Sequence, residues 1–418
     1  MKKITHIIWL TGVVCFWSLA TLATQTTPTP AQNTASSVHP QVISTLKIPV
    51  DSPAMIFSPG NWTGDSNRGG KTFRQTWNHG AYFRVSWTSS SAQPAAKITF
   101  DTSSLTPGTR PPVIAYKIDG VWKINVPCTN EINVEYISGA HQHDLMVTLL
   151  YSESKERWGS EGVSPANVLR VTGVWVDEGS QPIPASADSK WALIVGDSIT
   201  EGVGGTALAG YSHLLGQALR TQGYDYGISA CGWSGWIHKG NRPPGDVPGY
   251  YTITNARKDG VGQYDDALSR WNKIDGNGHS LLDAKGRISA YGQTGQEPAL
   301  IVINYGTNDG SVDANDIQAS MTQALAALRR GAPDAHIIII IPFNQTQNKA
   351  LKAGVAAHKK AHAEDSKVSV IDLGPDVKRF LDVKEGVFGG LHPNDRGYAN
   401  FAAQIIPQVI MIINRDGK

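Results

Sequence analysis

Residues 191–202, which read WALIVGDSITEG, constrain the fold of this 418-residue chain more than any other stretch. Ala192 to Val195 is an apolar run with the length of a buried strand, and a Gly-Asp-Ser turn ending at Ser198 follows it directly. In open α/β sheets, ligands bind at the carboxyl ends of the strands, which is where this order of residues puts the serine hydroxyl. Ser198 is therefore a candidate nucleophile; the alternative is that it caps the following helix.

Two later stretches have the same organisation. Residues 300–310, LIVINYGTNDG, are an apolar strand that ends in glycine and polar residues, and Asn308 could offer its amide to a developing oxyanion. Residues 389–397, GGLHPNDRG, precede a helical pattern, and His392 can act as general base if it folds back onto Ser198. Asn308 as a turn residue and His392 as a surface residue are the alternatives. The order of the three stretches along the chain favours one shared site.

The segments GDSIT and GTND and the late His-Pro pair resemble the SGNH (GDSL-type) hydrolases, a large family of serine esterases and acyl hydrolases. The resemblance covers the chain from about Trp191 to its end. It implies an oxyanion hole formed by the backbone N–H of Ser198, the N–H of a glycine in a second block, and the Asn308 amide. Gly232, in ISACGWSGW, matches the second-block glycine best, and Gly235 matches less well.

One position departs from the family pattern. The family usually has aspartate three residues before its histidine, and this chain has Gly389 there. The substitutes available in the sequence are Glu385, Asp382, Asp395, or a backbone carbonyl near Gly389 or Gly390. We predict a Ser198–His392 dyad in which a carbonyl orients Nδ1–H of the histidine. A carbonyl fixes the tautomer but stabilises imidazolium less than a carboxylate does. Neither a metal nor an organic cofactor is expected.

Strand-like and helical patterns alternate in residues 190–418, which predicts a flavodoxin-like, doubly wound parallel sheet. The expected strands are 192–195, 224–229, 300–304, 336–341 and 368–371. The expected helices are 207–221, 317–330, 349–364 and 396–413. A long insertion, 236–297, interrupts the pattern directly after the candidate oxyanion glycine. We predict a lid or substrate wall, with Trp233, Trp236 and Tyr250 as residues that stack on sugar rings; the alternative is a structural excursion with its own small core.

Residues 42–185 have a different sequence pattern, in which short runs of alternating apolar and polar residues are separated by Gly, Pro, Asn and Asp. This pattern predicts an all-β sandwich or jelly roll. A jelly roll before an SGNH domain resembles carbohydrate esterase family two, whose members remove acetyl groups from polysaccharides and include Ser-His dyads. The segments YFRVSWTS, IDGVWKINV and VTGVWVDEG carry this weaker likeness.

The N-terminus has the form of a secretory signal peptide. Lys2 and Lys3 precede an apolar run, and cleavage after Ala23 fits the small residues that follow. Residues 24–41 are rich in Thr, Ser, Pro and Gln and are expected to be a linker. The prediction is a periplasmic or secreted protein without stable membrane insertion after cleavage; an uncleaved anchor is the alternative.

Charge, cysteines and histidines narrow the function further. The 37 Lys and Arg residues nearly balance 35 Asp and Glu residues, which argues against a nucleic-acid partner. Cys128 and Cys231 could pair in an oxidising compartment, or Cys231 could be a small buried thiol. His141 and His143 alternate as on one strand face and could ligate a metal, but no other ligand cluster is evident, and no metal site is predicted.

These observations together predict a secreted serine esterase that removes acetyl or other small acyl groups from polysaccharide or another acyl ester. The alternatives are a noncatalytic polysaccharide-binding or assembly protein, and an acyltransferase or lipase of the same fold.

Overall fold

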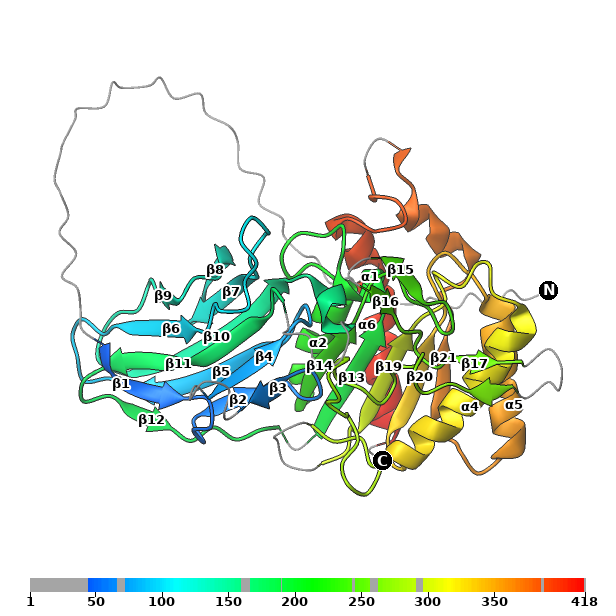
Figure 1. The fold of residues 1–418 in the computed structure, drawn as a ribbon, viewed down its shortest axis with the longest axis horizontal. Coiled ribbons are helices and arrows are strands. Elements are labelled where there is room, and N and C mark those ends of the chain that lie inside the picture. Colours follow the sequence, from blue (N-terminus) through cyan, green and yellow to red (C-terminus); the bar gives the residue numbers. More distant parts are fainter. Residues whose placement is uncertain are drawn as a thin grey trace, which may run out of the picture. The chain divides into compact units, whose positions relative to one another are not determined.

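The structure is a computed structural model that describes residues 44–65, 72–158, 166–188, 190–242, 245–255, 262–290, 296–384 and 387–416 (Figure 1). The predicted signal peptide, the predicted linker and Glu385 lie outside the described residues. The chain from residue 42 onward forms one compact unit. No helix in the described ranges combines the length and the apolar character that a membrane crossing requires.

Two antiparallel sheets make up the N-terminal region. The first has the strand order β3-β4-β11-β6-β9 with β1 paired to β11, and the second has the order β12-β5-β10-β7-β8 with β2 paired to β5. The strands of the first sheet are β1 (Ser44–Pro49), β3 (Thr63–Asp65), β4 (Phe73–Thr76), β6 (Ala96–Phe100), β9 (Glu131–Asn133) and β11 (Leu169–Asp177). Those of the second are β2 (Met55–Phe57), β5 (Tyr82–Thr88), β7 (Val113–Ile118), β8 (Val121–Pro127), β10 (Gln142–Tyr151) and β12 (Gln181–Ile183).

One apolar core contains residues of both sheets, which makes this region a β-sandwich. In β6 every second side chain is buried, as expected for a strand with one face on a core. Ile98 of the first sheet and Phe83 of the second belong to the same buried cluster, together with Cys128. Cys231 lies in a different cluster, so it forms no disulfide with Cys128. The predicted β-rich class is confirmed, and the jelly-roll connection pattern stays a prediction.

The C-terminal region contains one parallel sheet of five strands in the order β14-β13-β19-β20-β21. Its strands are β13 (Lys190–Gly196), β14 (Tyr224–Ala230), β19 (Leu300–Asn304), β20 (His336–Ile340) and β21 (Val368–Ile371). The chain order 2-1-3-4-5 is that of flavodoxin-like sheets. All residues of β19 and β20 are buried, because helices cover both faces of the sheet.

The helices divide between two apolar clusters. Residues of α2 (Tyr211–Arg220) and α6 (Asp395–Asp416) belong to one, and residues of α4 (Ala314–Gly331) and α5 (Asn348–Ala361) belong to the other. Between β14 and β19 the insertion forms two small hairpins, β15 (Gly240–Arg242) with β16 (Gly245–Val247) and β17 (Ile253–Thr254) with β18 (Gln263–Tyr264). Most of its buried apolar residues join the cluster of α4 and α5, and Val247 packs in a small cluster with Trp158 and Cys231.

The sandwich is attached to edge strand β14 by buried polar contacts. Asp225 of β14 accepts hydrogen bonds from Tyr82 Oη at 2.8 Å and from the Arg84 guanidinium at 2.8 and 2.9 Å. Asn61 Nδ2 donates to the carbonyl of Ile228 at 3.1 Å. These contacts are directional, so they fix how β5 and the loop of Asn61 meet β14, the neighbour of the strand that leads to Ser198.

Candidate active site

Strand β13 ends at Gly196 and leads directly into the short helix α1 (Ser198–Glu201). Asp197 caps this helix, since its carboxylate accepts from the Ile199 N–H at 2.9 Å. Burial raises the pKa of Asp197 to about 7. A side chain at Gly196 is excluded, because a Cβ there would lie 1.9 Å from Thr200 Oγ1. Asp197 thus braces the turn that presents Ser198.

The Ser198 Oγ atom lies 2.8 Å from Nε2 of His392. His392 lies in the loop before α6. This loop packs closely against Gly204, because a Cβ at Gly204 would lie 2.8 Å from the carbonyl oxygen of Pro393. Burial lowers the pKa of the His392 imidazole, and the charge of Glu201 opposes that shift. The histidine is therefore neutral near pH 7, which is the state that a general base needs.

Two of the carboxylates considered for orienting His392, those of Asp395 and Asp382, have other partners. Asp395 accepts hydrogen bonds from the backbone N–H and the hydroxyl of Thr206, and Asp382 accepts from the N–H of Lys384. Among the described residues, neither a carboxylate nor a carbonyl accepts a hydrogen bond from Nδ1–H of His392. Orientation by a carbonyl therefore stays a prediction.

Gly232 and Asn308 lie beside the serine and histidine. Asn308 donates one N–H of its Nδ2 to the carbonyl of Ser234 at 2.9 Å, and the same nitrogen carries a second N–H. The backbone N–H of Gly232 donates to Oε2 of Glu201 at 2.9 Å. Ser198, His392, Gly232 and Asn308 line one pocket of about 260 Å³.

The sandwich supplies part of the wall of this pocket. His79, Tyr151, Ser152 and Glu153 come from the N-terminal region and line the pocket together with the four residues above. A second cavity of about 430 Å³ shares four lining residues with it: His79, Tyr151, Glu201 and Val203. The two cavities are therefore neighbours that share part of their walls.

Residues 194–399 match the sequence model of the GDSL-like lipase/acylhydrolase family. The C-terminal domain belongs to this family. The resemblance inferred from the three sequence motifs is confirmed, and the chain is an ester hydrolase by class. A comparison with curated proteins gave no match.

Solved structures similar to this chain have the same two-part organisation. A family two carbohydrate esterase from Clostridium thermocellum in complex with cellohexaose is 14% identical, with a TM-score of 0.58 over 86% of this chain and 99% of that chain. The acetyl xylan esterase Est2A from Butyrivibrio proteoclasticus is 16% identical, with a TM-score of 0.57 over 88% and 98%. The salicylyl-acyltransferase SsfX3 from a tetracycline biosynthetic pathway is 13% identical, with a TM-score of 0.54 over 88% and 98%. At these identities the likeness establishes the fold.

Of the three aromatic residues expected to bind substrate, the acylhydrolase pocket includes one. Trp233 lines the pocket and is 49% exposed. Trp236 and Tyr250 are fully buried and pack edge to face with ring centroids 5.3 Å apart. This placement corrects the prediction for these two residues, because a ring without exposed surface cannot stack on a sugar. Gly235, the weaker candidate for the oxyanion hole, does not line this pocket, and its N–H donates to the carbonyl of His238 at 2.8 Å.

Glu201 is a pocket residue of the acylhydrolase domain that the sequence reasoning missed. A Cβ at Gly232 would lie 3.1 Å from its Oε2 and 3.2 Å from Ser198 Cβ, so the carboxylate lies close to the serine. Its charge also acts on two buried guanidiniums, those of Arg157 and Arg270. The signal was its position three residues after Ser198 in α1, because residues three apart lie on the same side of a helix.

Asp309, the last residue of the GTND segment, is a second residue that was missed. Its fully buried carboxylate accepts three backbone N–H groups, from Trp236 at 2.7 Å, His238 at 2.9 Å and Ile237 at 3.1 Å. Burial raises the pKa of Asp309, and the three donors act in the opposite direction. Asp309 therefore ties the segment after Gly232 to the loop of Asn308, the two loops that carry the candidate oxyanion donors.

Proposed function

We propose that this protein is a serine esterase that removes acetyl or other small acyl groups from carbohydrate. The observation that carries the proposal is the 2.8 Å contact between Ser198 Oγ and His392 Nε2, in a small pocket shared with Gly232 and Asn308. A neutral imidazole at this distance is suited to take the serine proton. Ser198 and His392 are the proposed catalytic residues.

The proposed reaction has two steps. His392 Nε2 takes the proton of Ser198 Oγ, which attacks the ester carbonyl and forms a tetrahedral oxyanion. His392 then gives the proton to the leaving sugar oxygen, and an acyl-serine remains. In the second step His392 takes a proton from a water molecule, whose oxygen attacks the acyl carbon. His392 then returns this proton to Ser198 Oγ as the acid is released.

The oxyanion is proposed to bind the N–H groups of Ser198 and Gly232 and the amide of Asn308. One such donor typically contributes about 3–4 kcal/mol at the transition state. Because the Gly232 N–H bonds to Glu201 in the structure, the substrate oxygen must replace that carboxylate as it binds. The Glu201 side chain is therefore expected to move when the site is occupied.

The carbohydrate part of the proposal is supported by the two neighbouring cavities. A pocket of about 260 Å³ suits a small acyl group, and the adjoining cavity of about 430 Å³ offers space for further sugar units. Trp233, half exposed at the pocket, offers a ring for stacking. The similar structures include proteins named as carbohydrate esterases and an acetyl xylan esterase.

We also propose that residues 42–185 form a jelly roll and that the protein acts in the periplasm or outside the cell. The support for the location is the sequence of residues 1–23, with its basic start, apolar run and small residues. Polysaccharide is a substrate that such a location makes available.

Hydrolysis of p-nitrophenyl acetate and of acetylated xylan, by the wild type and by Ser198→Ala, tests the proposal. Ser90→Ala serves as the control, since Ser90 is an exposed loop residue of the sandwich. We expect Ser198→Ala to lower kcat by at least about 10⁴-fold and the control to retain full activity. Turnover of both substrates by Ser198→Ala would refute the assigned nucleophile. Binding of insoluble glycan without turnover by the wild type would favour the noncatalytic alternative.

A further inference from the structure

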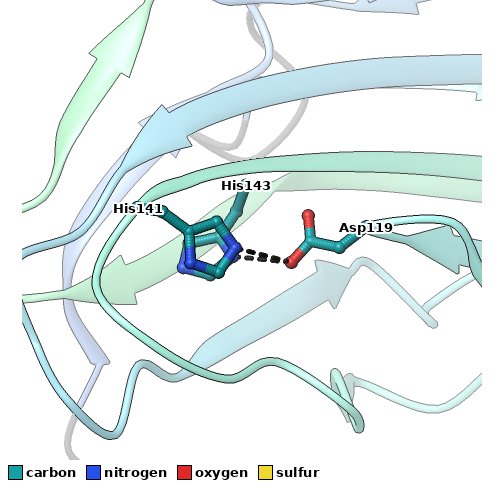
Figure 2. Close-up of side chains that lie close together, drawn as sticks. All are labelled: Asp119, His141 and His143. Carbon is teal, nitrogen blue, oxygen red and sulfur yellow. Dashed lines mark hydrogen bonds and ion pairs between the residues drawn. The ribbon is translucent and has the colours of Figure 1, made fainter.

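Three potential metal ligands converge at one end of the sandwich. Nδ1 of His143 lies 2.7 Å from Oδ2 of Asp119, and Nε2 of His141 lies 3.7 Å from the same oxygen. The three ligand atoms all lie within 4.8 Å of one another. Figure 2 shows both imidazole rings beside this carboxylate oxygen. We propose that Asp119, His141 and His143 bind a divalent transition metal of the zinc type.

The local sequence positions these ligands. His141 directly precedes β10, whose second residue is His143, and the two imidazole rings lie with their centroids 4.3 Å apart. Asp119 belongs to the Asp-Gly turn between β7 and β8 and has a φ of +49°. Its backbone N–H donates to the Asp144 carbonyl at 3.1 Å, and its Oδ1 accepts from the Asp144 N–H at 2.9 Å. Oδ1 and the backbone thus hold the carboxylate on β10, and Oδ2 is left for the histidines.

Packing inside the sandwich holds the His143 ring in one position without a metal. Its ring is fully buried and packs against Trp87 with centroids 5.4 Å apart. Its Nε2 atom is buried without a hydrogen-bond partner among the described residues. Only Nδ1 of His143 therefore faces the cluster, which makes it the nitrogen available to a metal.

The distances fit a metal after small adjustments. Ligand atoms of a tetrahedral zinc site with bonds of ~2.0–2.2 Å lie about 3.3–3.6 Å apart. The two Asp119 distances, 2.7 and 3.7 Å, lie on either side of that range. The His141 side chain is 51% exposed and that of Asp119 is 24% exposed, so both have room to adjust. The exposed side leaves a fourth position for water.

The donor set selects the class of metal. Two imidazoles and one carboxylate suit zinc, cobalt, nickel or copper, whereas calcium and magnesium require oxygen ligands. If Asp119 and His143 formed only a hydrogen bond with each other, a second histidine beside them would have no role. The His141 ring nevertheless lies beside that of His143, with centroids 4.3 Å apart. In the described part of the chain this is the one group of three such side chains that could hold a metal.

The position of the site points to a structural role. His143 and Tyr151 are eight residues apart along β10, which at ~3.3 Å per residue allows a separation of up to about 26 Å. Tyr151 lines the Ser198 pocket, so the metal site lies far from it. A metal here joins the β7–β8 turn to the start of β10. Binding to the folded state alone stabilises a protein by mass action. The proposal is therefore independent of the esterase proposal.

Calorimetric titration of untagged, chelator-treated protein with ZnCl₂, and thermal unfolding with and without zinc, test the site. We expect one zinc per chain, a higher Tm with zinc, and no Tm increase with magnesium or calcium at the same concentration. Cobalt is expected to give the visible absorption of a four-coordinate site. Absence of zinc binding by wild-type protein would overturn the proposal.

Two variants and a control assign the ligands. His141→Ala removes an exposed ligand. Asp119→Asn removes the carboxylate, but asparagine also tolerates the positive φ of this position, and its side-chain oxygen can still accept from the Asp144 N–H. We expect each to weaken zinc binding by at least about 100-fold, since loss of even an outer-shell partner costs ~10–100-fold. His362→Ala, which removes a histidine with a 47% exposed side chain, is expected to bind zinc as the wild type does. Unchanged zinc affinity in both ligand variants would overturn the assignment.

Discussion

Oε2 of Glu201 accepts a hydrogen bond from the backbone N–H of Gly232 at 2.9 Å, where the oxyanion of an ester substrate is expected to bind. The same carboxylate raises the pKa of His392, against the effect of burial. Glu201 therefore has two opposing effects in the proposed mechanism. Its negative charge opposes an oxyanion at Gly232 and stabilises the imidazolium that forms on His392.

The first prediction concerns the pH dependence of Glu201→Gln. Activity requires neutral His392, so kcat/KM falls as the pH drops through the pKa of this residue. Burial already lowers that pKa below 6.5, and loss of the Glu201 charge lowers it further. We expect the acid limb of the kcat/KM profile, which reports the free enzyme, to move to lower pH in Glu201→Gln.

Glu153→Gln is the matched control, because Glu153 lines the same pocket and accepts a hydrogen bond from Tyr151. Its acid limb is expected to coincide with that of the wild type. An acid limb of Glu201→Gln that stays in place or moves to higher pH would contradict the role assigned to the Glu201 charge.

The second prediction concerns Asn308. Its amide is the only proposed oxyanion donor that a substitution can delete outright, because the other two are backbone N–H groups. We expect Asn308→Ala to lower kcat by about 10²–10³-fold with little change in KM, as for an interaction made in the transition state. Steady-state kinetics with p-nitrophenyl acetate measures both constants. Asn400→Ala, on helix α6, is the control and is expected to leave both constants unchanged. An effect of Asn308→Ala on KM alone would instead assign the amide to substrate binding.

The third prediction concerns Asp309. In Asp309→Asn an NH₂ group replaces one of the two oxygens that accept from Trp236, Ile237 and His238. At least one buried N–H then faces another donor, and we expect a loss of about 1–3 kcal/mol in the free energy of unfolding. We also expect kcat to fall, because the segment after Gly232 loses its attachment. Urea unfolding and esterase kinetics measure the two effects.

Asp376→Asn, at an exposed position, is the control for Asp309→Asn and is expected to change neither quantity. Full stability of Asp309→Asn would show that the three hydrogen bonds do not hold the segment.

The residues that the sequence identified in the site have a common property. Ser198 and Asn308 each follow a strand of the parallel sheet, and parallel strands end at one edge, so the chain order was enough to bring them together. Gly232 also follows a strand, but it was identified through the family resemblance. His392 precedes α6 instead and was predicted as general base from the stretch GGLHPNDRG. The strands were evident because their apolar runs are continuous, as in a sheet covered on both faces.

The residues that the sequence could not place depend on irregular segments. Trp236 and Tyr250 lie in the insertion, where no period of 2 or 3.6 separates a core position from a solvent-facing one. The three donors to Asp309 are backbone groups and leave no trace in the sequence. Asp119 is 22 positions before His141, and only the register of β7 against β10 brings the two together.

The last prediction concerns the family's usual aspartate. Gly389 has a φ of +84°, and a Cβ there would lie 2.5 Å from the backbone nitrogen of Asn394 and 2.8 Å from the carbonyl oxygen of His392. Gly389→Asp therefore cannot restore a triad without displacing the loop of the general base. We expect lower esterase activity and a loss of stability larger than the ~1–3 kcal/mol of a strained backbone position alone. Gly223→Asp is the control, because Gly223 has a φ of +75° and no atom within 4 Å of its Cβ position. This variant therefore measures the strain of the positive φ without a steric clash. A Gly389→Asp variant that is more active than the wild type would show that this loop accepts the carboxylate after all.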